Sequence, residues 1–195
     1  MTDVPTRGRP RSPEAHRAIL EATLDLLVEG GFRALSMDAV AALAGVGKAT
    51  IYRRWRSKNE LVAAAIETLS AAIGLADTGT LRGDYLALAR QAMGTVNTPL
   101  STIVPRLLAE AAGDPDLHEI FVEHLVRPRR RALDTLVRRA EERGEIRTGL
   151  DHEVVIDVLA GPVMYRLLLA ALGMNAPRNY PAKVFDQVFA GLAPS

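Results

Sequence analysis

The 195-residue sequence contains no cysteine, which excludes disulfides, thiol catalysis and every cysteine-containing zinc site. That composition is typical of a reducing compartment. Uninterrupted apolar runs of membrane-spanning length are also lacking, because Arg, Asp, Gly or Pro breaks each of the apolar stretches. The first residues, "MTDVPTRGRPRSPEA", have no apolar core of the kind found in signal peptides. We therefore expect a cytoplasmic protein without a membrane segment.

Signals of catalysis and of metal binding are equally scarce. The chain has no phosphate loop and no nucleophile motif, and its four histidines show neither HxxxH nor HExxH spacing. We therefore expect no enzymatic activity, no metal and no cofactor. No motif connects the polar residues that an enzyme would have to use, which are Ser101, Glu110, Asp116 and His118.

Strand signals are nearly absent, whereas Ala, Leu, Arg and Glu recur at helical spacing, so the sequence predicts an all-α protein. Pro128 predicts a kink in one of the long helices, and Gly161-Pro162 predicts a bend in another. Ser57 and Glu60 form a capping box at the start of the fourth helix. The helices are expected over 13–31, 36–45, 47–55, 58–74, 81–96, 99–112, 115–143, 152–172 and 181–193.

The formal net charge is only +1, but the positive charges gather near the amino end. Residues 1–60 carry ten Lys and Arg against seven Asp and Glu, and residues 61–195 carry fourteen against sixteen. This distribution indicates a local site for a polyanion on an otherwise balanced protein. The cations of the amino-terminal region are Arg7, Arg9, Arg11, Lys48, Arg53, Arg54, Arg56 and Lys58, together with Arg17 and Arg33.

The first three predicted helices have the lengths and the glycine-containing turn of a helix-turn-helix unit. Its second short helix leaves a small, polar and basic face, as a helix that enters the major groove requires. Lys48 can donate to guanine O6 and N7, and Ala49 can touch a thymine methyl; Arg53 can also read a base. Thr50 and Tyr52 can donate to phosphate oxygens. The residues expected in the core of this unit are Ile19, Leu26, Leu27, Phe32, Leu35, Val40, Leu43, Val46 and Ile51.

The segment "GFRALSMDAVAALAGVGKATIYRRWRSKNELVAAAI" resembles the DNA-binding domain of the tetracycline-repressor (TetR) family of bacterial transcription regulators. The resemblance covers roughly residues 13–66, with its elements in order. Two positions depart from it. Gly47 lacks the hydroxyl that often caps the recognition helix. Trp55 replaces the common Phe, so its extra bulk must pack against the first or fourth helix or its indole N–H must find a partner. The matching residues are the Gly31-Phe32 joint, Ser36, Ala41, the Ala44-Gly45-Val46 turn, Thr50-Ile51-Tyr52, Ser57-Lys58 and Glu60-Leu61.

The resemblance implies specific roles for residues and a mode of assembly. It places Lys48, Ala49, Tyr52 and Arg53 on base-facing positions. It places Ser36, Thr50, Arg54 and Lys58 on phosphate-facing positions. It further implies a homodimer, joined through the last two long helices of each chain, that acts as a repressor on a palindromic operator in double-stranded DNA and is released by a small-molecule effector.

The carboxy-terminal helices supply candidate residues for the effector and for the dimer. Those expected at a ligand pocket are Met93, Val96, Leu107, Phe121, His124, Leu125, Met164, Tyr165 and Leu168, for which a plain core role is the alternative. Those expected at the dimer interface are Val154, Val155, Val158, Leu159, Val184, Phe185, Val188 and Phe189, for which an internal core is the alternative. The six arginines of residues 127–139 are interpreted as a salt-bridged helix face.

The chain is thus expected to consist of a disordered basic arm over residues 1–11, a helix-turn-helix domain over 12–60 and a regulatory and dimerisation domain over 67–195, with the helix at 58–74 between the two domains. The arginines of the arm either contact DNA or only solubilise the chain. The rival function is a helical protein-interaction scaffold without specific DNA binding. Its affinity would not depend on salt or duplex sequence.

Overall fold

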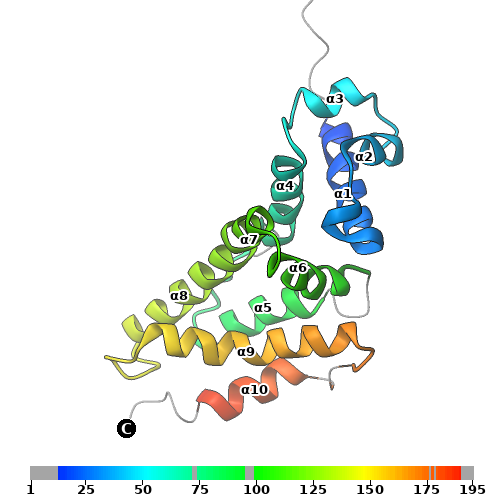
Figure 1. The fold of residues 1–195 in the computed structure, drawn as a ribbon. Helices are drawn as coiled ribbons and strands as arrows, with labels where there is room; N and C mark the ends of the chain where they lie inside the picture. The colour runs from blue at the N-terminus through cyan, green and yellow to red at the C-terminus, as the bar shows by residue number, and fades with distance from the viewer. Residues whose placement is uncertain (1–12, 72–73, 95–98, 176, 178, 190–195) are drawn as a thin grey trace, which may run out of the picture.

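The computed structural model describes residues 13–71, 74–94, 99–175, 177 and 179–189, and the secondary structure of these residues is entirely helical (Figure 1). The all-α prediction is confirmed. The predicted arm over residues 1–11 lies outside the described residues. The elements are α1 (Pro13–Ala34), α2 (Met37–Leu43), α3 (Lys48–Tyr52), α4 (Lys58–Ala71), α5 (Leu81–Met93), η1 (Pro99–Thr102), α6 (Ile103–Ala111), α7 (Pro115–Phe121), η2 (Val122–Val126), α8 (Arg127–Glu142), α9 (His152–Ala171) and α10 (Tyr180–Phe189).

Figure 1 shows α1, α2 and α3 grouped at one end of the molecule and α9 and α10 at the other. The helix α4 leads away from the first group, and α6 and α7 lie between the two ends. The capping box predicted at the start of α4 is present: Ser57 Oγ accepts a hydrogen bond from the Glu60 amide at 3.1 Å, and the Glu60 carboxylate accepts one from the Arg56 amide at 2.8 Å.

The first helix is interrupted at Gly31, where the backbone has φ +75° and ψ −176°. Glycine adopts this conformation readily because it has no Cβ. The sequence predicted the end of the helix at Gly30-Gly31, and the break lies at the second of these glycines. A short turn follows, and Ser36 then caps α2 by accepting a hydrogen bond from the Ala39 amide at 3.1 Å.

One hydrophobic core joins the helix-turn-helix unit to α4, α6 and α7. Six of the nine predicted core residues of the unit are buried: Ile19, Leu27, Phe32, Leu35, Val40 and Ile51. Leu26 and Val46 are partly buried against them. The prediction that Leu43 belongs to the core is wrong, because Leu43 is 54% exposed and lies off the buried face that Val40 and Ala41 form on α2. The same core continues through Leu107 of α6 and Phe121 of α7, so the amino-terminal unit packs firmly on its neighbours.

A second core lies between α5, α8, α9 and α10. Its largest buried side chains are Tyr85 and Phe185, whose ring centroids are 5.4 Å apart. The predicted helix over 115–143 is divided into α7 and α8 by the π-helical segment η2, which ends two residues before Pro128. Proline removes a helical hydrogen bond and crowds the preceding turn, so a local change of helix type is expected there.

The helix α9 is long and apolar enough, by length and composition, to cross a membrane, and among the described residues it alone meets this test. It continues through Pro162 as one helix. Val155, Ile156, Leu159, Val163 and Leu167 are buried where α9 contacts α5, α8 and α10. The helix α9 is therefore the central helix of the second core.

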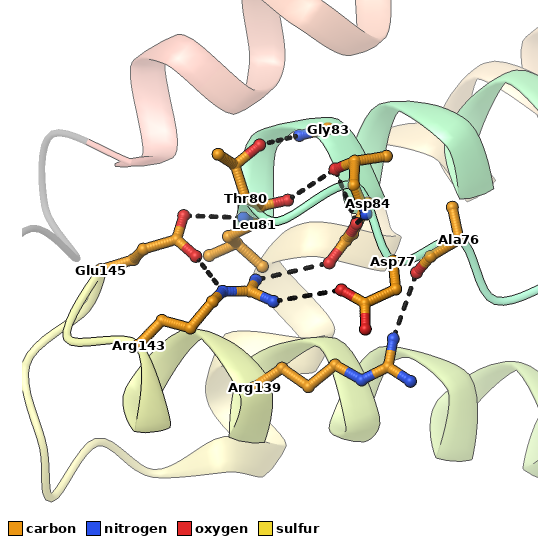
Figure 2. Close-up of polar contacts among 10 residues, drawn as sticks. Ala76, Asp77, Thr80, Leu81, Gly83, Asp84, Arg139, Arg143 and Glu145 are labelled. Atoms are coloured by element: carbon orange, nitrogen blue, oxygen red, sulfur yellow. Dashed lines mark hydrogen bonds and ion pairs between the residues drawn. The ribbon is translucent and has the colours of Figure 1, made fainter.

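Arg143, at the end of α8, holds the turn before α5 through a network of carboxylates (Figure 2). It forms ion pairs with Asp77, Asp84 and Glu145, and Glu145 accepts a hydrogen bond from the Leu81 amide at 2.7 Å. Burial by itself would raise the pKa of Asp84, but hydrogen bonds from Thr78 and Arg143 outweigh it and hold that pKa below its ordinary value. The network fixes α5 against α8 on one side of the second core.

Candidate DNA-binding surface and effector cavity

The helix α3 is held in place by its buried side and by the residue that follows it. Ile51 is fully buried, and Trp55 is buried and stacks on His16 of α1 with ring centroids 5.2 Å apart. This stacking confirms the expected packing of Trp55. Gly47 occupies the N-cap with an extended backbone and makes no side-chain hydrogen bond. The other side of α3 faces solvent.

All four residues predicted to face bases, Lys48, Ala49, Tyr52 and Arg53, are exposed. Their contacts with bases stay a prediction. The structure adds a partner that the sequence did not reveal: the Lys48 ammonium donates a hydrogen bond to Asp38 Oδ2 of α2 at 2.6 Å. This hydrogen bond and the charge of Asp38 raise the pKa of Lys48 above its ordinary value. A carboxylate therefore sits beside the leading cation of the recognition helix.

The residues predicted to face phosphates differ in their surroundings. Ser36 is exposed, whereas Thr50 and Arg54 are half-buried. Lys58 has a role that the sequence did not indicate, because its Nζ donates to the Phe32 carbonyl oxygen at 3.0 Å and lies 4.1 Å from the Phe32 ring centroid. Its contact with phosphate stays a prediction, and the structure gives it a structural contact with the end of α1.

The segment of α1 around its break, residues 28–33, is also held by α6, and we call this segment the α1 joint. Arg106 Nη1 donates to the carbonyl oxygens of Val28 and Glu29 at 2.6 and 3.2 Å. The Glu110 carboxylate accepts hydrogen bonds from the Phe32 and Arg33 amides at 2.9 and 3.3 Å. Backbone carbonyls and amides beside a helix break can lose their partners within the helix, and side chains such as these can replace them. The α1 joint is thus bound by Lys58 of α4 and by Arg106 and Glu110 of α6.

A cavity of about 270 Å³ lies in the regulatory part of the molecule, close to the lower end of the size range of small-ligand sites, about 300–1,000 Å³. Most of its wall is apolar and comes from α5 and α9. The helix α4 contributes Thr68 and Leu69, α6 contributes Val104, and α8 contributes Arg129 and Leu133. The helices α4 and α6, which bind the α1 joint, therefore also line the cavity.

Most of the residues predicted to line a ligand pocket lie elsewhere. Met164 does line the cavity, and Val96 lies outside the described residues. The other predicted residues do not line this cavity, and their place at a ligand site stays a prediction: Met93, Leu107, Phe121, His124, Leu125, Tyr165 and Leu168. Phe121 fills the first core, Tyr165 is 57% exposed, and His124 lies near the surface with its Nδ1 2.8 Å from Glu67 Oε1. The predicted residues share α5, α6 and α9 with the cavity, whereas the contributions of α4 and α8 were not predicted.

The residues predicted at a dimer interface divide into two groups. Val154 and Val158 are exposed, as an interface requires. Val155, Leu159 and Phe185 are wrong as interface residues, because they are buried in the second core of the same chain. The half-buried members of the predicted set are Val184, Val188 and Phe189.

Three of the six arginines of residues 127–139 form salt bridges, as the sequence predicted, and Arg127 does so with Glu123 at 3.1 Å. Arg130 pairs with Asp157 and Glu153 of α9, and Arg138 pairs with Asp134 at 2.8 Å. Arg129 differs, because it turns towards the cavity. Among the described residues, no group of three or more His, Asp or Glu side chains is placed to hold a metal ion.

An exposed basic recognition helix on a three-helix unit, packed against a larger helical domain with an apolar cavity, defines a DNA-binding transcriptional regulator of the helix-turn-helix class. The family model "Bacterial regulatory proteins, tetR family" matches residues 19–65, and the model "Tetracyclin repressor-like, C-terminal domain" matches residues 75–188. The chain belongs to the TetR family of transcriptional regulators.

Relatives and solved structures agree with this assignment. The chain is 35% identical over 170 residues to the HTH-type transcriptional regulator YdeS of Bacillus subtilis (strain 168), covering 87% of this chain and 86% of that protein. It is 34% identical over 165 residues to the DNA-binding transcriptional repressor TetR of Mycobacteroides abscessus, covering 84% and 85%. The crystal structure of the TetR family transcription regulator SCO0332 superposes with a TM-score of 0.71 at 29% identity, covering 93% of this chain and all of that one.

Proposed function

We propose that the protein is a homodimeric, cytoplasmic repressor that binds a palindromic operator through α3 and is released by a small molecule held in the cavity. The observation that carries the DNA-binding part is the exposed face of Lys48, Ala49, Tyr52 and Arg53 on a helix fixed by Ile51. The relative from Mycobacteroides abscessus, which is named a DNA-binding transcriptional repressor, supports repression as the direction of control.

The proposed dimer rests on an apolar stripe along α9. Val154, Val158 and Tyr165 are 56%, 40% and 57% exposed, and Leu172, directly after the helix, is 75% exposed. They recur at intervals of four and seven residues, which places them on one side of the helix. A stripe of this kind is expected to be covered, and a second copy of the same helix covers it by two-fold symmetry. Two recognition helices would then face successive major grooves.

The proposed release rests on the two helices that touch both the cavity and the α1 joint. A ligand beside Thr68 and Leu69 on α4 and Val104 on α6 would shift these helices where they line the cavity. The far ends of the same helices hold the α1 joint through Lys58 and Glu110. A small shift would therefore change the separation of the two recognition helices, so that both no longer fit the operator at once.

Selection of bound sequences from random duplex DNA tests the proposal. We expect enrichment of a palindrome whose half-sites lie about one helical turn apart or slightly more, roughly 34–36 Å between centres. Binding to it should weaken steeply with salt. The rival scaffold function predicts no enriched sequence and no salt slope, and that result would contradict the proposal.

A further inference from the structure

The wall of the cavity combines a large apolar surface with a single charged side chain. Among the described residues that line it, Arg129 carries the only formal charge, and no Asp or Glu takes part. The neutral polar side chains of the wall already donate hydrogen bonds to backbone carbonyl oxygens of the protein. Tyr85 donates its hydroxyl to the Leu159 carbonyl at 3.2 Å, Gln91 Nε2 donates to the Gly74 carbonyl at 3.2 Å, and Thr68 donates to the Ala65 carbonyl at 2.6 Å.

The Arg129 guanidinium is without the partner that a buried cation needs. The residue is half-buried, and its Nη1 is buried with no hydrogen-bond partner in the described part of the chain. Burial lowers the pKa of Arg129 to about 10, so the group is still protonated at neutral pH. The neighbouring Arg130 illustrates the contrast, because it pairs with two carboxylates of α9. A buried, unpaired charge is unfavourable, and an anion brought into the cavity would compensate it.

We infer that the effector of this protein is a carboxylate with an apolar body, whose anionic group pairs with Arg129 while its body lies against the apolar walls from α5 and α9. The inference deepens the proposed function, since it assigns a chemical class to the proposed effector. The planar guanidinium suits a carboxylate because it can offer two parallel N–H donors. An organic cation would meet Arg129 with no acidic residue in the described wall to offset it.

Calorimetric titration of the purified protein with octanoate, octan-1-ol and octylamine tests this class directly. These probes share one alkyl chain and differ in the polar group. We expect octanoate to bind the wild-type protein roughly tenfold or more tightly than octan-1-ol, and octylamine to bind least. Arg129→Met should abolish the preference for octanoate over octan-1-ol. Arg131→Met, which removes an exposed arginine of the same helix, should leave it intact.

Thermal unfolding provides a second readout, because it measures Tm and does not require a dissociation constant. Arg129→Met should raise the Tm of the ligand-free protein, because it removes an uncompensated buried charge. Octanoate should raise the Tm of the wild type and of Arg131→Met, and not that of Arg129→Met. If Arg129→Met does not fold, Arg129→Lys keeps the charge, loses the planar fork and should bind octanoate more weakly than the wild type.

Equal binding of octanoate and octan-1-ol by the wild type would overturn the inference, and so would a preference that survives Arg129→Met. The operator is assayed separately with the same samples. Octanoate that binds through Arg129 without releasing DNA would uphold the ligand class and contradict the proposed release. Loss of operator binding in every variant would instead count against the proposed function.

Discussion

Gly31 links the two parts of the molecule at the scale of a single residue. Its backbone conformation is restricted almost entirely to glycine, and a Cβ built there would overlap the Glu110 carboxylate and lie 2.9 Å from Arg106 Nε. The absence of a side chain thus allows the two residues of α6 to reach the α1 joint. The resemblance marked Gly31 as part of the family's joint, and the structure gives a steric reason why this position needs glycine.

Gly31→Ala is therefore expected to destabilise the protein by about 1–3 kcal/mol through its backbone conformation, and further through the displaced Glu110. Gly45→Ala is the matched control, because Gly45 also has positive φ, +64°, and a Cβ there would meet nothing within 4 Å. The control should show the cost of a positive φ without a steric contact, about 1–2 kcal/mol. Chemical denaturation measures both values. A loss for Gly31→Ala no larger than that for Gly45→Ala would contradict this steric role of Gly31.

Asp38 limits the charge that the recognition helix presents to DNA. Asp38→Asn should tighten binding to random-sequence duplex and steepen the salt dependence by roughly one unit, because it removes a negative charge near the phosphates and frees the Lys48 ammonium. Fluorescence anisotropy at several salt concentrations measures the slope. Glu142→Gln removes the same charge from an exposed position on α8 and should change nothing. A slope unchanged by Asp38→Asn would place Asp38 outside the DNA-binding surface.

At the scale of elements, His152 joins the start of α9 to α8. Its Nδ1 lies 3.1 Å from Asp134 and its Nε2 lies 3.0 Å from Glu141, and both ring nitrogens can donate only in the protonated form. The hydrogen bonds with Asp134 and then Glu141 raise the pKa of His152 above 6.5. The stabilisation is therefore fully present below about pH 6.5 and is lost as pH rises through the raised pKa.

His152→Gln should accordingly lower the Tm more at about pH 6 than at about pH 9. The Tm of the wild type should fall more over this range than that of the variant. His118→Gln, at an exposed position on α7, serves as the control and should follow the wild type. Thermal unfolding in matched buffers gives the comparison. Parallel curves for wild type and His152→Gln would show that the two carboxylates do not favour the charged imidazole.

The sequence predicted the helices well because caps and breakers mark their ends locally. Ser36, Ser57 and Gly31 each act in the structure where the pattern placed them. It predicted the faces of α9 poorly, because apolar residues lie on both sides of that helix and periodicity cannot select the side that packs inward. Val154 is exposed and Val155 buried, although both are valines in adjacent positions.

In the candidate sites, too, the sequence predicted features set by neighbouring residues and missed contacts between residues far apart in the chain. The exposed face of α3 is formed by three residues of one short helix and the residue directly after it, so the sequence could identify it. The contact of Glu110 with the α1 joint joins residues 77 and 78 positions apart and has no local signal. Arg129 was hidden among five other arginines of residues 127–139, and only the packing of α8 shows that it turns inward.

At the scale of the whole molecule, the proposed function requires two copies of the chain with a fixed separation. The double substitution Val154→Glu and Val158→Glu should yield monomers and weaken operator binding by at least about a hundredfold, because two half-sites would no longer be bound together. Sedimentation and anisotropy measure the two effects. Leu108→Glu changes a large apolar residue on α6 that is 46% exposed and should leave the dimer intact. A dimeric double variant would place the interface elsewhere.

The most direct test of α3 as the reader of DNA is the affinity of Lys48→Ala for the selected operator and for a scrambled duplex, compared with wild type and with Arg131→Ala. We expect Lys48→Ala to weaken operator binding by about tenfold to a hundredfold while changing scrambled binding much less, and Arg131→Ala to match wild type. Unchanged operator affinity and preference in Lys48→Ala would contradict the assignment of α3 as the recognition helix.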